Sequence, residues 1–113
     1  MNFDKSLIAG STVLMVLHLL GTQDMYGYQM VKELEKRSEN TFTLKEGTLY
    51  PILHSLEKNG LVVSYVSYGQ SGRKRKYYQI TKNGKKQLAD KKKEWLIFSE
   101  TVNKVIRGSI YAL

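Results

Sequence analysis

The chain opens with apolar residues that predict a buried first helix. From about Asp4 to Leu20 the hydrophobic positions lie on nearly every side of a helical wheel, as in a helix at the centre of a fold. Gly21 follows directly and is expected to end this helix. The apolar run from Ser6 to Leu20 is too short for a bilayer, which needs about 20 residues, and Asp4 argues against a signal peptide. We therefore expect a core helix and no membrane partner.

Two amphipathic helices are predicted next. The first runs from about Tyr26 to Arg37, with apolar residues on one face and charged residues outward. The second begins near Leu44, where Thr43 and Glu46 form the pattern of a capping box. Its apolar residues recur at the spacing of a core-facing stripe: Leu49, Ile52, Leu53 and Leu56.

The helix that begins near Leu44, the third along the chain, contains Pro51 and is followed by Gly60. Pro51 lacks the N–H that would bond the carbonyl of Gly47, so a kink or an irregular first turn is expected rather than a break. Gly60 is a suitable residue to stop the helix.

A hairpin follows. Leu61 to Tyr68 and Lys76 to Ile80 are rich in valine, tyrosine and isoleucine, as strands are, and a glycine-containing loop joins them. Four consecutive cations lie where the chain turns back: Arg73, Lys74, Arg75 and Lys76.

The last predicted helix, about Lys82 to Ser109, would be about 40 Å long at 1.5 Å per residue. Its apolar residues form a short heptad seam that requires another helix to lie against. A second copy of the chain is one candidate, and the chain's own first helix is the other. The expected homodimer interface comprises Leu7, Leu14, Leu88, Trp95, Phe98, Val102, Val105 and Ile106.

Charge is concentrated in one segment. The net charge is +8, and residues 73–93 hold ten cations beside Asp90 alone. Such a focused field suits a polyanion, nucleic acid first and anionic lipid second; a solvated lysine-rich helix with an adjacent loop is the alternative. We expect Lys82, Lys85 and Lys86 to continue the basic field of the hairpin tip.

The sequence contains few of the residues that usually act as nucleophiles or metal ligands. The chain has no cysteine and two histidines, His18 and His54. The absence of cysteine excludes disulfides, zinc knuckles and thiol catalysis and fits a cytoplasmic location. His54 with Glu57 is the sole pair spaced to ligate a metal. We predict that the protein is not an enzyme and needs no cofactor or metal.

The order of elements predicts a mainly α (α+β) fold. Helix, helix, helix and hairpin is the order of a winged helix-turn-helix, here residues 1–81 with a two-stranded wing, followed by a long dimerisation helix at residues 82–113. In such folds the third helix enters the major groove of double-stranded DNA, while the hairpin tip reaches the flanking backbone. The residues available to the groove are Lys45, Glu46, Thr48, Tyr50 and His54. Arg73 and Lys74 are better placed for phosphate contact than Arg75 and Lys76, which already begin the returning strand.

Binding to RNA or to an anionic membrane surface remains an alternative. Tyrosines of the hairpin could stack on unpaired bases, yet adjacent Tyr77 and Tyr78 must point to opposite faces of a strand. The last helix has the apolar and cationic sides of a membrane-surface helix, but dimerisation explains its stripe better.

Three sequence blocks resemble the PadR family of bacterial transcriptional regulators. These blocks are "MYGYQMVKELEKRS", "LKEGTLYPILHSLEKNGLV" and "RKRKYYQITKNGKKQL", within a similarity that extends from Leu7 to about Leu88. The resemblance implies a winged helix-turn-helix with a C-terminal dimerisation helix, usually a repressor of genes for phenolic-acid detoxification or multidrug efflux. The single helix after the wing is similar to the compact branch of the family.

The resemblance also implies roles for individual residues. Tyr26 and Tyr28 open the second helix, where a tyrosine touches the DNA backbone, and Thr48, Tyr50 and the wing cations contact DNA. Trp95 lies where some compact members stack planar drugs at the dimer interface, which implies a small aromatic effector, a phenolic acid or a drug-like molecule. Three lysines and a glutamate precede Trp95, so a role in the dimer core is the interpretation we favour.

Overall fold

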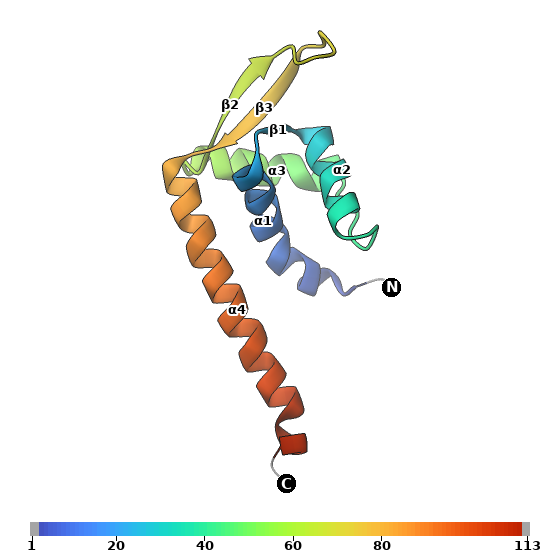
Figure 1. Cartoon of the computed structure of the whole chain (residues 1–113), viewed down its shortest axis with the longest axis vertical. Helices are drawn as coiled ribbons and strands as arrows, with labels where there is room; N and C mark the ends of the chain where they lie inside the picture. Colours follow the sequence, from blue (N-terminus) through green and yellow to red (C-terminus); the bar gives the residue numbers. More distant parts are fainter. Residues whose placement is uncertain (1–2, 112–113) are drawn as a thin grey trace.

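The computed structural model describes residues 3–111, with side chains described through residue 107. A small antiparallel sheet lies over three packed helices, and a fourth helix extends well beyond them (Figure 1). The molecule is accordingly elongated, 63 × 31 × 21 Å. The elements are α1 (Lys5–Thr22), β1 (Met25–Tyr26), α2 (Gly27–Arg37), α3 (Glu46–Lys58), β2 (Val62–Ser67), β3 (Arg75–Ile80) and α4 (Lys82–Tyr111). This order confirms the predicted mainly helical winged fold; the outer ends of the two predicted domains, residues 1–2 and 112–113, lie outside the described residues.

The second half of α1 forms the centre of the core. Its buried residues Val16, Leu17 and Leu20 pack in one cluster with side chains from α2, α3 and the sheet. By length and composition α1 could cross a membrane, but an ordinary core helix passes the same test. Burial of its second half identifies α1 as a core helix, as expected, where length and composition alone would not.

Gly21 does not end α1, contrary to the prediction, because the helix continues to Thr22. The glycine instead allows α4 to approach: a Cβ added there would lie 2.9 Å from Leu88 Cδ2. Leu88 is 8% exposed, so this residue of the predicted dimer seam lies within the subunit's own core. The alternative of α4 packing on the first helix is thus correct for the start of α4.

α3 starts later than predicted and ends as predicted. The capping box is wrong, because the N-cap residue is Lys45 and no side chain caps the helix. The helix continues through Pro51 without a break. At its end Gly60 has a φ of 73°, and the N–H of Leu61 donates to the carbonyl of Leu56 at 2.9 Å. This arrangement is a Schellman motif, which requires at Gly60 the left-handed backbone conformation that glycine adopts readily.

The sheet has three strands, one more than predicted. Its order is β1-β3-β2, and both pairings are antiparallel. Met25 and Tyr26 pair with Tyr78 and Tyr77, so the two residues before α2 occupy the free edge of β3. The start of α2 is therefore fixed to the wing through backbone hydrogen bonds.

α4 starts directly beneath the sheet. Thr81 caps it, since the Gly84 N–H donates to the Thr81 hydroxyl at 3.0 Å. The Thr81 N–H in turn donates to the carbonyl of Leu61 at 3.0 Å. Gly84 lies so close to the chain just before β2 that an added Cβ would overlap the Leu61 carbonyl oxygen. From this contact α4 runs away from the wing and out of the globule (Figure 1).

Candidate nucleic-acid interface

α3 presents a polar face beside its core-facing stripe. Leu49, Leu53 and Leu56 are buried and Ile52 is half-buried, as the periodicity predicted. The side chains predicted for the groove are all exposed: Lys45, Glu46, Thr48, Tyr50 and His54. α3 can therefore present these groups to a partner without losing its core contacts.

Tyr50 packs across the start of α2. A Cβ added to Gly27 would lie 2.5 Å from Tyr50 Oη and 2.9 Å from Cζ, so glycine is required for this close approach. The Tyr50 side chain remains 46% exposed. Partial burial, and then the negative charge of Glu46, raise the pKa of its hydroxyl. Tyr50 is thus a protonated hydrogen-bond donor at neutral pH.

Two of the four wing cations lie in the turn. Gly69 and Gly72 adopt φ values of 60° and 72°, the left-handed backbone that favours glycine. Arg73 and Lys74 follow them and are exposed at the far end of the hairpin from α4.

The other two wing cations begin β3 and point to opposite faces of the sheet. The guanidinium of Arg75 lies 4.3 Å from the centroid of the Tyr26 ring. The amine of Lys76 lies 5.6 Å from the centroid of Tyr78. Each of these two cations thus lies beside an aromatic ring of its own face of the sheet.

A row of three tyrosines, which the sequence did not predict, crosses the sheet. Tyr77 contacts Tyr26 edge to face, with centroids 5.5 Å apart, and stacks on Tyr65 at 5.7 Å. The Tyr65 hydroxyl donates to the Asp24 carboxylate at 2.6 Å, which raises the pKa of Tyr65 to about 12. One tyrosine comes from each strand, so only the pairing of β1 with β3 could have revealed this row.

The start of α2, α3 and the wing together enclose an open cavity of about 520 Å³. It is lined by Tyr26, Gly27, Tyr28, Tyr50, Arg73, Arg75, Lys76 and Tyr78. The fold thus brings together six of the predicted DNA-contact residues. It leaves Lys45, Thr48, His54 and Lys74 exposed outside this cavity.

All the charged side chains that line this cavity are positive. Its lining includes three cations and four tyrosines but no carboxylate. The first residues of α2, Gly27 and Tyr28, line the cavity, so the positive end of that helix faces it. No side chain caps this end, which leaves N–H groups available for an anion. Such an arrangement suits consecutive phosphates of a nucleic-acid backbone.

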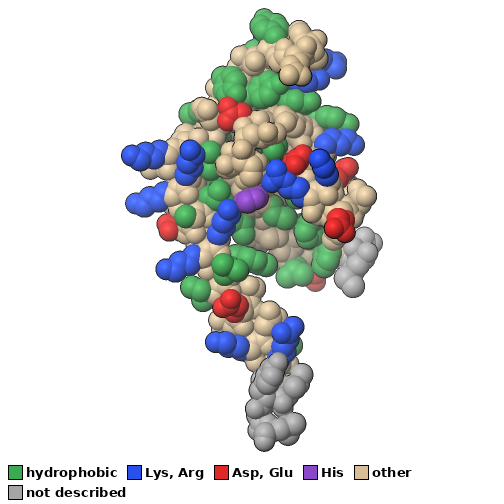
Figure 2. Space-filling view, in the orientation of Figure 1, with side chains coloured by type: hydrophobic (Ala, Val, Ile, Leu, Met, Phe, Trp, Pro, Cys, Tyr) green, Lys and Arg blue, Asp and Glu red, His purple; other side chains and the backbone are tan. Residues whose placement is uncertain are grey.

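The basic field is divided, contrary to the prediction. Arg75 opens β3 at the wing tip, whereas Ile80 closes β3 just before Lys82 begins α4. Six strand residues separate these ends by about 20 Å. Figure 2 accordingly shows Lys and Arg side chains near the wing and a separate row of them along α4. The α4 lysines therefore do not continue the surface of the wing tip.

The apolar stripe of α4 is exposed along the part that leaves the globule. Leu14 is half-buried and Leu88 is buried, but the other residues predicted for the dimer interface are exposed. The largest exposed fractions belong to Val105 and Ile106, at 80% and 68%. Trp95 lies 6.5 Å from Phe98, measured between ring centroids, and is 41% exposed.

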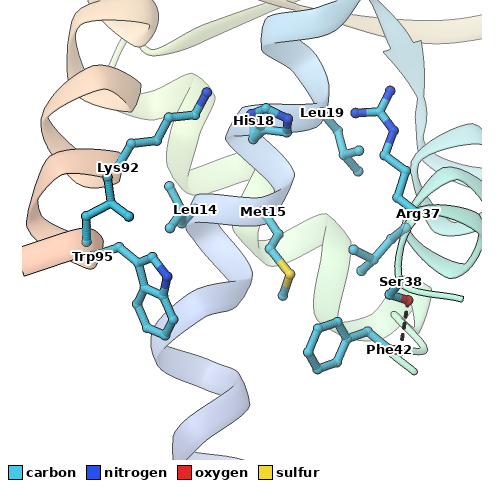
Figure 3. Close-up of a pocket in the computed structure, with 11 residues that line it drawn as sticks. Leu14, Met15, His18, Leu19, Arg37, Ser38, Phe42, Lys92 and Trp95 are labelled. Atoms are coloured by element: carbon cyan, nitrogen blue, oxygen red, sulfur yellow. Dashed lines mark hydrogen bonds between the residues drawn. The ribbon is translucent and has the colours of Figure 1, made fainter. Parts of the chain in front are cut away.

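A second cavity, of about 530 Å³, lies beside Trp95 between α1, the end of α2 and α4 (Figure 3). Its walls are mainly apolar, and Lys92, His18 and Arg37 lie around one side. Within residues 3–111 no cluster of three His, Asp or Glu side chains is arranged to hold a metal ion.

Comparison with known proteins gives consistent matches. Residues 16–90 match the Transcriptional regulator PadR-like family. Transcriptional regulator Rv3488 of Mycobacterium tuberculosis is 35% identical over 75 residues, 66% of each chain. A PadR-like transcriptional regulator from Bacillus cereus is 30% identical, with a TM-score of 0.81, over 91% of this chain and 98% of that one. A PadR family regulator from Clostridium difficile is 36% identical, with a TM-score of 0.74, over 85% and 98%.

Proposed function

Because this chain belongs to the PadR-like family of transcriptional regulators, we propose that it binds double-stranded DNA as a homodimer and acts as a ligand-responsive repressor. This family consists of regulators rather than enzymes. A regulator of transcription works where the genome is, so a cytoplasmic location belongs to the proposal.

The observation that carries DNA binding is the convergence of Tyr50, the start of α2 and the wing cations on one cavity without carboxylates. In this proposal α3 enters the major groove with Lys45, Thr48 and His54 toward the bases and phosphates. Arg73 and Lys74 then contact the backbone beside the groove. Tyr26 and Tyr28, at the start of α2, face the phosphates of the same strand.

Homodimerisation is supported by the exposed stripe of α4. A helix that leaves its own globule with apolar side chains exposed needs a partner surface. We propose residues 82–113 as the dimerisation segment and residues 1–81 as the DNA-binding domain. Two-fold symmetry then predicts an inverted-repeat operator whose half-sites lie one helical turn, or a multiple, apart.

Titration against three polyanions tests DNA binding. The protein should bind an operator duplex from its source genome with an affinity that falls steeply with salt. It should bind single-stranded RNA of equal length and anionic vesicles far more weakly. The stacked Tyr65 and Tyr77 rings cover one another and so offer little platform for bases. Equal affinity for RNA or for vesicles would instead favour the alternative that the protein binds RNA or an anionic membrane surface.

Charge substitution on α4 tests the dimer. Phe98→Glu with Val105→Glu should raise the dimer dissociation constant at least about 100-fold, because each carboxylate would be buried without a partner. Both side chains are exposed in the subunit, so its fold should be unaffected. Sedimentation velocity provides the measurement.

Ile97→Glu is the matched control. Ile97 is also exposed but lies on another side of the helix, about 100° from Phe98. The control should sediment as the unaltered protein does. A double variant that stays dimeric would exclude this face as the interface.

A further inference from the structure

The tyrosine row, formed by Tyr26, Tyr77 and Tyr65, crosses the face of the sheet that points away from the helices. On the other face Val62 and Tyr78 are buried in the core. Tyr65 and Tyr77 lie directly opposite one another on β2 and β3, and side chains alternate between the two faces of a sheet. The row therefore lies on the solvent side, where the packing of the core does not account for it.

A hydrogen bond at one end of the row spans the whole sheet. Tyr65 lies on β2, at one edge, and Asp24 directly precedes β1, at the other edge. The Tyr65 hydroxyl donates to the Asp24 carboxylate at 2.6 Å, so it connects elements two strand spacings apart, about 10 Å. Because this bond raises the pKa of Tyr65 to about 12, the hydroxyl remains a donor well above neutral pH.

The row also contacts the part of the wing that holds its cations. Tyr77 is the central member, and a Cβ added to Gly69 in the turn would lie 3.0 Å from the Tyr77 hydroxyl oxygen. On its other side Tyr77 contacts Tyr26, whose ring centroid lies 4.3 Å from the Arg75 guanidinium. Among the described side chains Arg75 forms no ion pair, so its N–H groups are available to a phosphate. Contacts thus extend from Asp24 to the turn and to Arg75.

The backbone link between the wing and the start of α2 is short. β1 has two residues, whereas β2 and β3 have six each. Within the described residues β2 makes two side-chain hydrogen bonds outside the hairpin, from Ser64 to Glu57 of α3 and from Tyr65 to Asp24. Ser64 and Tyr65 point to opposite faces of the sheet. The Tyr65 bond is therefore the one that holds β2 on the solvent side.

We propose that Asp24 and Tyr65 are positioning residues for DNA binding, which hold the wing at a fixed angle to α2 so that its cations meet the phosphates. This inference rests on the proposed DNA-binding function. Neither side chain contacts DNA; the hydrogen bond and the tyrosine row fix the turn and Arg75 relative to β1. A wing that is ordered before binding avoids the entropy cost of ordering it in the complex.

Tyr65→Phe tests the role of the hydroxyl. The variant keeps the ring and loses the hydrogen bond, so its wing has to be ordered on binding, and affinity for the operator duplex should fall about fivefold. The slope of log affinity against log salt should stay unchanged, because the same phosphates are still contacted. Fluorescence anisotropy at several salt concentrations measures both quantities. Unchanged affinity would overturn the proposal, and so would a slope reduced by about 0.9, since Tyr65 would then be a phosphate contact.

Ser64→Ala is the matched control. It also removes from β2 one hydroxyl that donates to a carboxylate, but on the face that packs against α3. Because Ser64 lies on the other face from the tyrosine row, this variant should bind the operator as the unaltered protein does. Equal losses for Ser64→Ala and Tyr65→Phe would mean that the general stability of β2 controls binding, which would contradict the proposal.

Two substitutions of Asp24 test it as the partner of Tyr65. Asp24→Asn and Asp24→Ala remove the same charge, but only asparagine keeps an oxygen that accepts from the Tyr65 hydroxyl. The asparagine variant should therefore bind the operator about fivefold more tightly than the alanine variant. When Tyr65→Phe is also present the two should bind equally, because the hydrogen bond is already absent. A difference that persisted without the hydroxyl would exclude Asp24 as its partner.

A measurement without DNA separates this inference from the proposed function. NMR order parameters of the backbone at residues 68–74, in the wing turn, should fall in Tyr65→Phe and stay unchanged in Ser64→Ala. Unchanged order parameters in Tyr65→Phe would overturn the positioning role. If they fell as expected but the unaltered protein bound no duplex, the result would contradict the proposed function and confirm that the hydrogen bond restrains the wing.

Discussion

Alanine at both Arg73 and Lys74 is expected to reduce the slope of log affinity against log salt by about 1.8, because each lost phosphate contact contributes about 0.9. Between 50 and 200 mM salt the unaltered protein should therefore lose about 12-fold more affinity than the variant. The loss should be similar for operator and unrelated duplexes, since phosphates carry no base sequence. Electrophoretic mobility or fluorescence anisotropy at several salt concentrations measures it.

Lys82→Ala with Lys86→Ala is the matched control for this experiment. The control also removes two positive charges, but from the opposite end of the hairpin, where α4 begins. A simple effect of net charge would change both slopes equally. Because the wing tip and the start of α4 lie about 20 Å apart, we expect only the tip variant to change. If the tip variant and the control variant had the same slope of log affinity against log salt, the wing tip would not contact the DNA phosphates.

Gly84→Ala is expected to destabilise the protein by about 3 to 5 kcal/mol, the range of severe single substitutions. The added Cβ would overlap the Leu61 carbonyl oxygen and lie 2.6 Å from Ile80 Cγ1. Relief requires α4 to move away from β2, which disrupts the cap that Thr81 provides. For a chain of this size the melting temperature should fall by about 12 to 25 °C.

Gly47→Ala separates this clash from the general effect of alanine in a helix. Gly47 lies in the first turn of α3, and nothing lies within 4 Å of an added Cβ. Alanine there should leave the melting temperature unchanged or raise it, because alanine favours helix by about 1 kcal/mol over glycine. If the two variants melted together, the close approach of α4 to β2 would be wrong.

Helices with a clear hydrophobic periodicity could be predicted from the sequence, but the residues at which they begin and end were predicted less accurately. Leu49, Leu53 and Leu56 identify the buried face of α3 because side chains return to one face every 3.6 residues. Thr43 failed as a cap because Leu44 is itself buried and anchors the chain before the helix begins. At Gly21 the helix continues to Thr22, and the glycine lies against Leu88 of α4. At both positions the structure adds a contact with distant residues that the local sequence does not show.

The candidate interface was predicted as a set of residues but not as an arrangement. The sequence pointed to Tyr50 and the wing cations, yet nothing local indicates that Tyr50 lies over Gly27. Two residues, Met25 and Tyr26, are too few to display a strand period. They form β1 only because β3 has a free edge, and this pairing brings Tyr26 to Arg75.

The sequence by itself determined the order of the elements, the buried stripe of α3 and the four cations of the wing, because each depends on residues close together in the chain. The tertiary structure alone decided which of these residues share a surface. It joins Tyr50, the start of α2 and the wing in one cavity, and it separates the wing cations from the α4 lysines that follow them in sequence. The physical reason is that strand pairing and the close approach at Gly27 and Gly84 are contacts between distant residues, which no local period encodes.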